Sequence, residues 1–157
     1  MPLNIRPALD KDHEKIKKLL KDLDLYYSGL KFKDFWAAED NGKIVGIVQL
    51  EEFENFLFLG SLGVAPDQQK HGIAKALLYK ILENHKKDVY LYTIIPDFFK
   101  KFGFQLTTPN SELITPNSKL ITPNSELITP NSLPTKSRYE CEYCHSDQCV
   151  TMVRHAA

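Results

Sequence analysis

An apolar strand that leads through a glycine-bearing turn into an amphipathic helix occupies the middle of the sequence. The run from Phe56 to Val64 is apolar enough for a strand, and apolar residues recur at helical spacing from Ile73 to Leu82. The turn between them ends at Gly72, where the absence of a side chain lets the backbone approach a ligand closely. The first amides of a helix have no intrahelical partner and the helix dipole is positive there. This order therefore predicts an α/β domain with an anion site around Gly72.

Further apolar runs predict a sheet around this unit. Asp40-Asn41-Gly42 separates the runs Phe35–Glu39 and Lys43–Leu50, and an Asn-Gly pair between such runs is a strong hairpin signal. Asp10 is a candidate N-cap for a helix with apolar residues at positions 16, 19, 20 and 23. Other short strands are expected at 4–6, 89–95, 104–106 and 150–153, with a short helix over 97–102 that ends at Gly103.

Length and charge favour a single globular domain over residues 1–157. Lys plus Arg and Asp plus Glu both total 20, and like charges do not gather in blocks. This composition gives no sign of a nucleic-acid partner or a membrane partner. Because no targeting signal precedes the domain and no apolar run could span a bilayer, we expect a cytoplasmic protein that is a monomer or a homodimer.

A tandem repeat lies between the body of the domain and its tail. The seven-residue unit that begins Thr-Pro-Asn-Ser starts at Thr108, recurs from Thr115 and Thr122, and is cut short at Ser132. A proline every seven residues excludes a continuous helix, and Thr-Pro-Asn-Ser is typical of a type I turn. We interpret residues 107–133 as an expanded surface loop inserted into the domain. The alternative is a repeat that binds a ligand or associates with itself.

Two motifs give the chain a family resemblance. The spacing Gln69-x-x-Gly72-x-Ala74 matches the Q/R-x-x-G-x-G/A signature of the GNAT acetyltransferases, and the segment Phe98–Phe104 resembles their later F-[YF]-x-x-x-G-F motif. The chain is most similar to small proteins of the N-acetylglutamate-synthase type. The resemblance implies a mixed, mostly antiparallel central sheet flanked by helices. It also implies transfer of an acetyl group from acetyl-CoA to a primary amine of a small molecule, with an amino acid such as glutamate as acceptor. The alternative is a GNAT-like domain that binds acyl-CoA as a sensor or interaction module with little turnover.

The same resemblance implies which residues bind the cosubstrate. Backbone amides in the glycine turn would receive the pyrophosphate of coenzyme A, and the end of the preceding strand would pair with its pantetheine arm. The implied cosubstrate-binding residues are Leu62, Gly63, Val64, Gln69, Lys70, His71, Gly72, Ile73, Ala74, Lys75 and Phe99. Phe99 stands where many relatives carry a tyrosine acid, and a phenyl ring cannot donate a proton. Either coenzyme A leaves as a thiolate, or solvent, Tyr92 or Thr93 supplies the proton.

Candidates for the acceptor side are less sharply defined. Glu51, Glu52 and Glu54 lie at an expected hairpin where these enzymes often place a carboxylate, and we prefer Glu51 or Glu54 as the catalytic base. The alternative is that all three are solvated. Tyr26 and Tyr27 occupy the loop that walls the acceptor pocket in this fold, although half-buried packing also explains them.

The cysteines are confined to the tail, in the segment 139–157. Cys141, Cys144 and Cys149, together with His145 or His155, could supply four zinc ligands. A second C-x-x-C pair, as zinc ribbons have, is missing from the sequence. We therefore predict no metal, and interpret these residues as reduced structural cysteines or as one adventitious disulfide.

Overall fold

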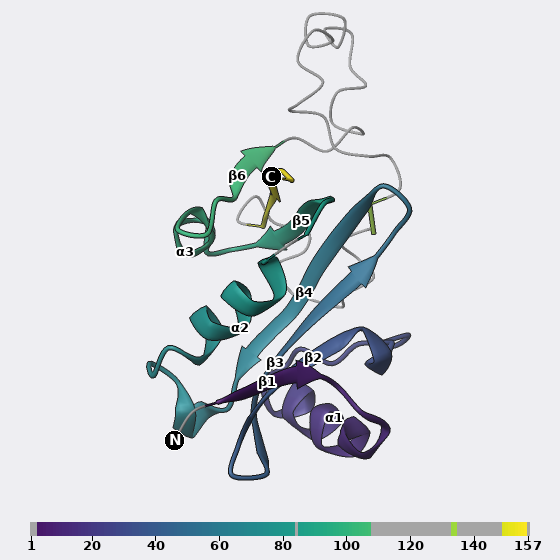
Figure 1. Ribbon diagram of the computed structural model, residues 1–157, viewed down its shortest axis with the longest axis vertical. Coiled ribbons are helices and arrows are strands. Elements are labelled where there is room, and N and C mark those ends of the chain that lie inside the picture. The colour runs from purple at the N-terminus through teal and green to yellow at the C-terminus, as the bar shows by residue number, and fades with distance from the viewer. Residues whose placement is uncertain (1–2, 84, 108–132, 135–148, 157) are drawn as a thin grey trace, which may run out of the picture.

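The computed structural model describes residues 3–83, 85–107, 133–134 and 149–156 of the chain (Figure 1). Within them one sheet has the strand order β1-β2-β3-β4-β5-β7-β6, and every neighbouring pair is antiparallel except β4 with β5. The mixed, mostly antiparallel sheet expected from the sequence is confirmed. The strands are β1 (Asn4–Pro7), β2 (Phe35–Asp40), β3 (Lys43–Glu52), β4 (Phe56–Val64), β5 (Asp88–Thr93), β6 (Gln105–Thr107) and β7 (Val150–Arg154).

Helices cover both faces of this sheet. They are α1 (His13–Asp22), α2 (Ile73–Leu82) and α3 (Pro96–Lys100), with short 3-10 turns η1 (Asp10–Asp12), η2 (Phe32–Asp34) and η3 (Pro66–Gln68). Along β3, Ile44 and Ile47 pack in the cluster of α1 while Val45 and Val48 pack in the cluster of α2. The alternation of faces is interrupted at Val45, where the pairing of β3 with β2 shifts by one residue. The strands therefore separate α1 from α2, and two apolar cores hold the helices in place (Figure 1).

The hairpin at Asn41-Gly42 forms as the sequence predicts. Both residues have positive φ, 52° at Asn41 and 79° at Gly42, and they connect the pair Asp40 and Lys43. Positive φ at both central positions defines the type I′ turn, whose twist matches that of the strands it joins. The hairpin fixes β3 between β2 and β4 at the centre of the sheet.

Two expected regions fall mainly outside the described residues. They are the repeat at 108–132 and the tail at 135–148, so the structure does not test the interpretation of the repeat as a surface loop. The closing strand expected at 150–153 is β7, which lies between β5 and β6. Within the described part of the chain, no helix has the length and apolar character needed to cross a membrane.

The prediction that Asp10 caps the first helix is wrong. Asp10 lies in η1, and α1 begins only at His13. The backbone N–H of Leu9 instead donates to Asp12, whose Oδ2 lies 2.8 Å away. Asp12 is held by Arg6 as well, and the chain makes one tight turn to bring Asp12 to that partner before the helix starts.

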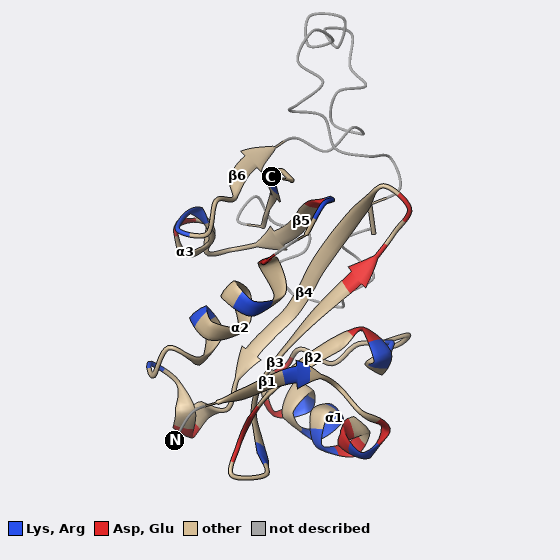
Figure 2. Ribbon diagram, viewed as in Figure 1, with Lys and Arg blue, Asp and Glu red and all other residues tan. Residues whose placement is uncertain are grey.

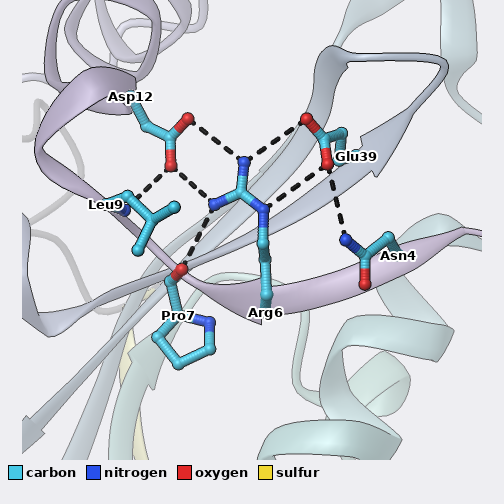
Figure 3. Close-up of polar contacts among 6 residues, drawn as sticks. All are labelled: Asn4, Arg6, Pro7, Leu9, Asp12 and Glu39. Atoms are coloured by element: carbon cyan, nitrogen blue, oxygen red, sulfur yellow. Dashed lines mark hydrogen bonds and ion pairs between the residues drawn. The ribbon is translucent and has the colours of Figure 1, made fainter.

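Arg6 joins the first strand to the first turn and to β2 (Figure 3). Its Nη1 and Nη2 donate to the two carboxylate oxygens of Asp12 at 2.6 and 3.2 Å, and Nη2 also donates to Glu39 at 3.4 Å. The Asp12 side chain is only 3% exposed, whereas those of Arg6 and Glu39 are 17% and 22% exposed. The hydrogen bond from Arg6 lowers the pKa of Asp12 below its usual value. The guanidinium, whose own pKa is raised by the hydrogen bond to Asp12, stays charged throughout.

We expect Asp12→Ala to destabilise the protein by about 2 kcal/mol at pH 7. Breaking a fully buried pair costs roughly 3–5 kcal/mol, and Arg6 keeps some contact with water here. Because the folded-state pKa of Asp12 is lowered, its stabilising effect exists above the unfolded-state pKa and is lost as pH falls through the folded-state value. Urea denaturation should therefore show a gap between wild type and variant that is constant near neutrality and narrows below about pH 4. Asp10→Ala, on the exposed side of the same turn, should change little. A gap that persists undiminished at low pH would contradict the prediction.

Candidate functional site

Strand β4 changes partner along its length. It pairs in parallel with β5 only over Phe56–Phe58. On its other edge, Gly60 lies opposite Gln49 and Gly63 opposite Ile47, so that Ser61 and Leu62 together face Val48 alone. The extra residue makes a β-bulge, and Ser61 has a φ of 50° there. A bulge bends its strand, and β4 accordingly leaves β5 just before this point.

A cavity of about 910 Å³ opens where the two strands part. Its walls come from β4 at 59–62, from β5 and the residues after it at 91–95, from Phe99 on α3, from Cys149, and from Lys21 with residues 23–26 at the end of α1. Only Lys21 and Asp24 carry charge among these lining residues. Figure 2 likewise shows β4 without any charged residue, whereas β3 ends in acidic ones. The cavity is thus lined mainly by uncharged side chains and main chain, and its two charged residues come from the end of α1 and the loop after it.

The loop after β4 has the geometry predicted for an anion site. Gly72 has a φ of 80° and precedes Ile73, the first residue of α2, and a Cβ built on Gly72 would meet no atom within 4 Å. The first amides of α2 have no partner within the helix, and no acidic residue lies in its first turn. The loop is held by the side chain of Gln69, whose Nε2 donates to the carbonyl oxygen of Val64 at 3.1 Å. The space over Gly72 is therefore open, and it adjoins a helix N-terminus, where the dipole is positive and the N–H groups have no intrahelical partner.

The start of α2 depends on a glycine in the neighbouring strand. A Cβ at Gly46 of β3 would lie 2.7 Å from Cγ2 of Ile73 and 3.1 Å from Cδ1 of Leu77. Gly46 pairs with Val64, the last residue of β4, so the strand end and the helix start are both in contact with this position. The missing side chain lets α2 lie directly on the sheet.

The two tyrosines of the loop after α1 have different surroundings. Tyr26 lines the cavity, and the ammonium groups of Lys17 and Lys21 lie 5.9 and 5.1 Å from its ring centroid. Tyr27 is only 1% exposed, and its hydroxyl donates to Oε1 of Gln49 at 2.9 Å. Tyr26 therefore remains a wall residue, while Tyr27 belongs to a buried polar pair.

The three glutamates near the end of β3 also differ. Glu51 is buried, 6% exposed, and lies opposite Phe58 in the sheet. Glu52 is exposed and paired with Lys87 at 2.9 Å, and this hydrogen bond lowers its pKa. Glu54 is exposed in the turn. None of the three is among the described residues that line the cavity, and Glu51 is the one whose strand position lies nearest to it.

The residues considered for proton donation lie together at one wall. Phe99 is buried and lines the cavity, as do Tyr92 and Thr93. The Tyr92 hydroxyl donates to the carbonyl oxygen of Pro134, and Thr93 Oγ1 accepts the N–H of Ile95 at 2.9 Å. Leu62 and Phe99 of the predicted set line the cavity, and Gly63 and Val64 continue β4 beyond it. The residues from Gln69 to Gly72 form the loop before α2, and those from Ile73 to Lys75 form its first turn.

Two features of the site are not predicted from the sequence. The bulge at Ser61 and the Tyr27–Gln49 pair both depend on which residues meet across strands, and no local motif marks them. Of the three cysteines, Cys149 is buried at the cavity wall, while Cys141 and Cys144 lie outside the described residues. Among the residues that are described, no group of His, Cys, Asp and Glu is arranged to hold a metal ion.

Known proteins share this architecture. Residues 31–106 match the family model described as an acetyltransferase (GNAT) domain. N-acetylaspartate synthetase of Xenopus tropicalis is 36% identical over 80 residues, which cover 47% of this chain and 30% of that protein. N-acetylglutamate synthase from Neisseria gonorrhoeae, complexed with coenzyme A and N-acetyl-glutamate, superimposes with a TM-score of 0.68 at 19% identity, over 100% of this chain and 36% of that one. Rv2747 from Mycobacterium tuberculosis, in complex with CoA and NLQ, gives 0.68 at 18% identity over 98% and 99% of the two chains. This chain thus spans about a third of the length of the first two proteins, and the fold expected from the sequence is confirmed.

We expect Gly46→Ala to destabilise the protein by about 1–3 kcal/mol, the usual cost of overpacking a core. The new methyl group would meet Cγ2 of Ile73, which is bonded to a branched carbon next to the helix backbone, so α2 itself has to move. Gly60→Ala is the matched control, because its Cβ would lie at an ordinary 3.6 Å from Gln49 Oε1. Urea denaturation of both variants measures the difference, and equal stabilities would show that α2 is not seated on Gly46.

Proposed function

We propose that this chain is an acetyltransferase of the GNAT type, which transfers an acetyl group from acetyl-CoA to the amine of a small molecule, with an amino acid as the acceptor class. One observation carries the proposal: the open space over Gly72, at the start of α2, belongs to the segment that directly follows β4, the strand whose bulge lines the cavity. A long cosubstrate with an anionic middle and a reactive end fits such an arrangement.

The residues present suit the parts of that cosubstrate. The amides at the start of α2 would hold the pyrophosphate, because they are unpaired and the first turn lacks acidic side chains. The edge of β4 beyond Phe58 is not paired with β5, and its main chain would hydrogen-bond the amides of the pantetheine arm. Acetyl-CoA, when bound, supplies the thioester whose carbonyl carbon the amine attacks.

The chain's own contribution to the reaction is positioning, charge stabilisation and proton removal. The cavity floor of Leu59, Leu62 and Leu91 excludes water from the reacting atoms. Main-chain N–H groups around the bulge at Ser61 would act as donors to the developing oxyanion. Glu51, buried on β3, would take the proton that the amine loses, either directly or through one water. Thr93 or Tyr92, at the cavity wall, would supply a proton to the departing sulfur.

The acceptor class rests on relatives and on charge. N-acetylglutamate synthase holds an acetylated amino acid, and N-acetylaspartate synthetase is named for another. In this chain Lys17 and Lys21 lie beside Tyr26 and outnumber Asp24, the acidic residue at the same rim, and this balance suits an anionic acceptor.

A second candidate function is an acyl-CoA-binding sensor with little turnover. The observation in its favour is Phe99, a ring without a hydroxyl at the position where many relatives carry their acid. Phe99→Tyr separates the two functions. A rise in rate would mean that thiolate protonation limits a working enzyme, while a protein that binds acetyl-CoA but turns over no amine in either form would be the sensor.

We expect Gly72→Glu to weaken acetyl-CoA binding at least about tenfold, or 1.4 kcal/mol. The added carboxylate would occupy the space over the turn and repel the pyrophosphate. Gly29→Glu is the matched control, because Gly29 has a similar φ of 86° and equally open surroundings but lies in the loop after α1. Calorimetry on both folded variants measures the affinities, and an unchanged affinity in Gly72→Glu would remove this loop from the site.

We expect Glu51→Gln to lower kcat/KM for the amine about 10²–10⁴-fold, the range of a positioned base, with acetyl-CoA affinity unchanged. Glu54→Gln is the control, because Glu54 is exposed in the turn and should leave the rate unaltered. Initial rates of both variants, measured over a range of pH, show whether Glu51 or Glu54 acts as the base. If both variants keep full activity, the amine loses its proton to water and neither carboxylate is the base.

A further inference from the structure

Gln49 of β3 is a buried side chain whose amide oxygen is hydrogen-bonded and whose amide nitrogen is not. It is 2% exposed, its Oε1 accepts the hydroxyl of Tyr27, and its Nε2 has no hydrogen-bond partner among the described residues. A buried donor left unpaired costs about 1–3 kcal/mol. If the amide were turned over, its oxygen would be the unpaired atom instead, so one polar group stays open in either orientation.

The position of Gln49 relates this group to the cavity. Its partner across the sheet is Gly60, which lines the cavity and is the last regularly paired residue before the bulge at Ser61. A Cβ at Gly60 would lie 3.6 Å from Oε1 of Gln49, so the carboxamide lies beside the backbone of Gly60 with no side chain of that residue between them. Gln49 itself does not line the cavity and is separated from it at this point by Gly60. Gln49 also contacts the loop after α1 through Tyr27, and Tyr26 of that loop lines the same cavity.

The reaction defines what this donor could meet. The proposed function places the thioester carbon at the bulge, and the reacting amine would then lie next to Gly60, the sheet partner of Gln49. An oxygen within reach of both the amine and the carboxamide belongs to a group on the carbon that bears the amine. In a free α-amino acid that group is the α-carboxylate, and hydrogen bonds from neutral donors to charged acceptors are the stronger kind.

We propose that Gln49 binds the α-carboxylate of the acceptor amino acid, with Nε2 as the donor, and that Tyr27 fixes the orientation of the carboxamide. This inference rests on the proposed acetyltransferase function and names the substrate group that the site selects. Gln49 is then a substrate-binding residue and Tyr27 a positioning residue.

The test compares pairs of acceptors that differ only in that carboxylate. Each proteinogenic L-amino acid is assayed beside its decarboxylated amine, for example glutamate beside 4-aminobutyrate, and the best-used amino acid is carried forward with its amine and its α-amide. Gln49→Glu keeps an acceptor for the Tyr27 hydroxyl and nearly the same shape, but replaces the free donor by an anion. Gln105→Glu on β6, an exposed position, carries the same substitution as a control.

For Gln49→Glu we expect KM for the amino acid to rise at least about 100-fold, since a lost hydrogen bond to a charged group is joined by repulsion. KM for the α-amide should rise less, and KM for the decarboxylated amine and for acetyl-CoA should stay unchanged. Gln49→Met, which lacks both the donor and the charge, should raise KM for the amino acid about tenfold and keeps the test available if the glutamate variant does not fold. Tyr27→Phe should reduce the preference for amino acid over amine about fivefold, a ratio that loss of stability alone would leave unchanged.

Several results would overturn the inference while leaving acetyl transfer intact. One is a wild-type protein that uses decarboxylated amines as well as it uses amino acids. The others are a Gln49→Glu variant in which KM rises equally for the amino acid and its α-amide, or equally for all three acceptors. If wild type turns over no amine, the proposed function fails, and calorimetric titration of the CoA-saturated protein with N-acetyl-L-glutamate decides on Gln49 separately. Binding that falls tenfold or more in Gln49→Glu supports the role, and equal or absent binding in both proteins contradicts it.

Discussion

The separation of β4 from β5 is the constraint on which the rest of the site depends. β4 is bound to β3 along nearly its whole length, but to β5 for three residues only. Beyond that point its backbone donors and acceptors on one edge need other partners, because buried main-chain groups are almost always paired. The bulge at Ser61 adds a residue to β4 that has no partner in β3, and it bends β4 away from β5. A strand edge that the fold itself leaves open is thereby offered to a ligand.

The remaining elements keep that opening in shape. α2 rests on Gly46 from one face, and its first amides are directed past Gly72. From the other face the loop after α1 brings Tyr26 to the cavity and Tyr27 to Gln49. The Arg6–Asp12–Glu39 cluster joins β1, η1 and β2. It therefore fixes the position at which α1 begins and the strand, β2, to which the chain returns after α1. The charged cluster does not line the cavity, yet it positions α1 and the loop after it, which form one of the cavity walls.

Local signals in the sequence predicted most of the fold but only part of the site. Asn41-Gly42 and Gly72 each specify their own backbone conformation, so a turn and a helix start could be assigned from a few residues. Asp10 and Asp12 are equally good caps by type, but neither side chain caps α1, because Asp12 is bonded to Arg6 and to the N–H of Leu9, and no local pattern reveals the contact with Arg6. Gln49 reads as one polar position in an apolar strand, and its pairing with Tyr27 and Gly60 exists only once three segments have met. The bulge is likewise a property of register between two strands.

The place of β7 has a consequence for how the chain is made. β7 lies between β5 and β6, so the last strand of the sheet to be synthesised fills a position flanked by strands made earlier. Until Val150–Arg154 leaves the ribosome, β5 has one bare edge and β6 has no partner in the sheet. The ladder then pairs Thr107 with Thr151, which fixes both ends of the intervening segment regardless of its length. Each doubling of such a loop costs only about 0.6 kcal/mol in closure entropy. The register of β6 with β7 therefore sets no limit on the number of residues between Thr107 and Thr151.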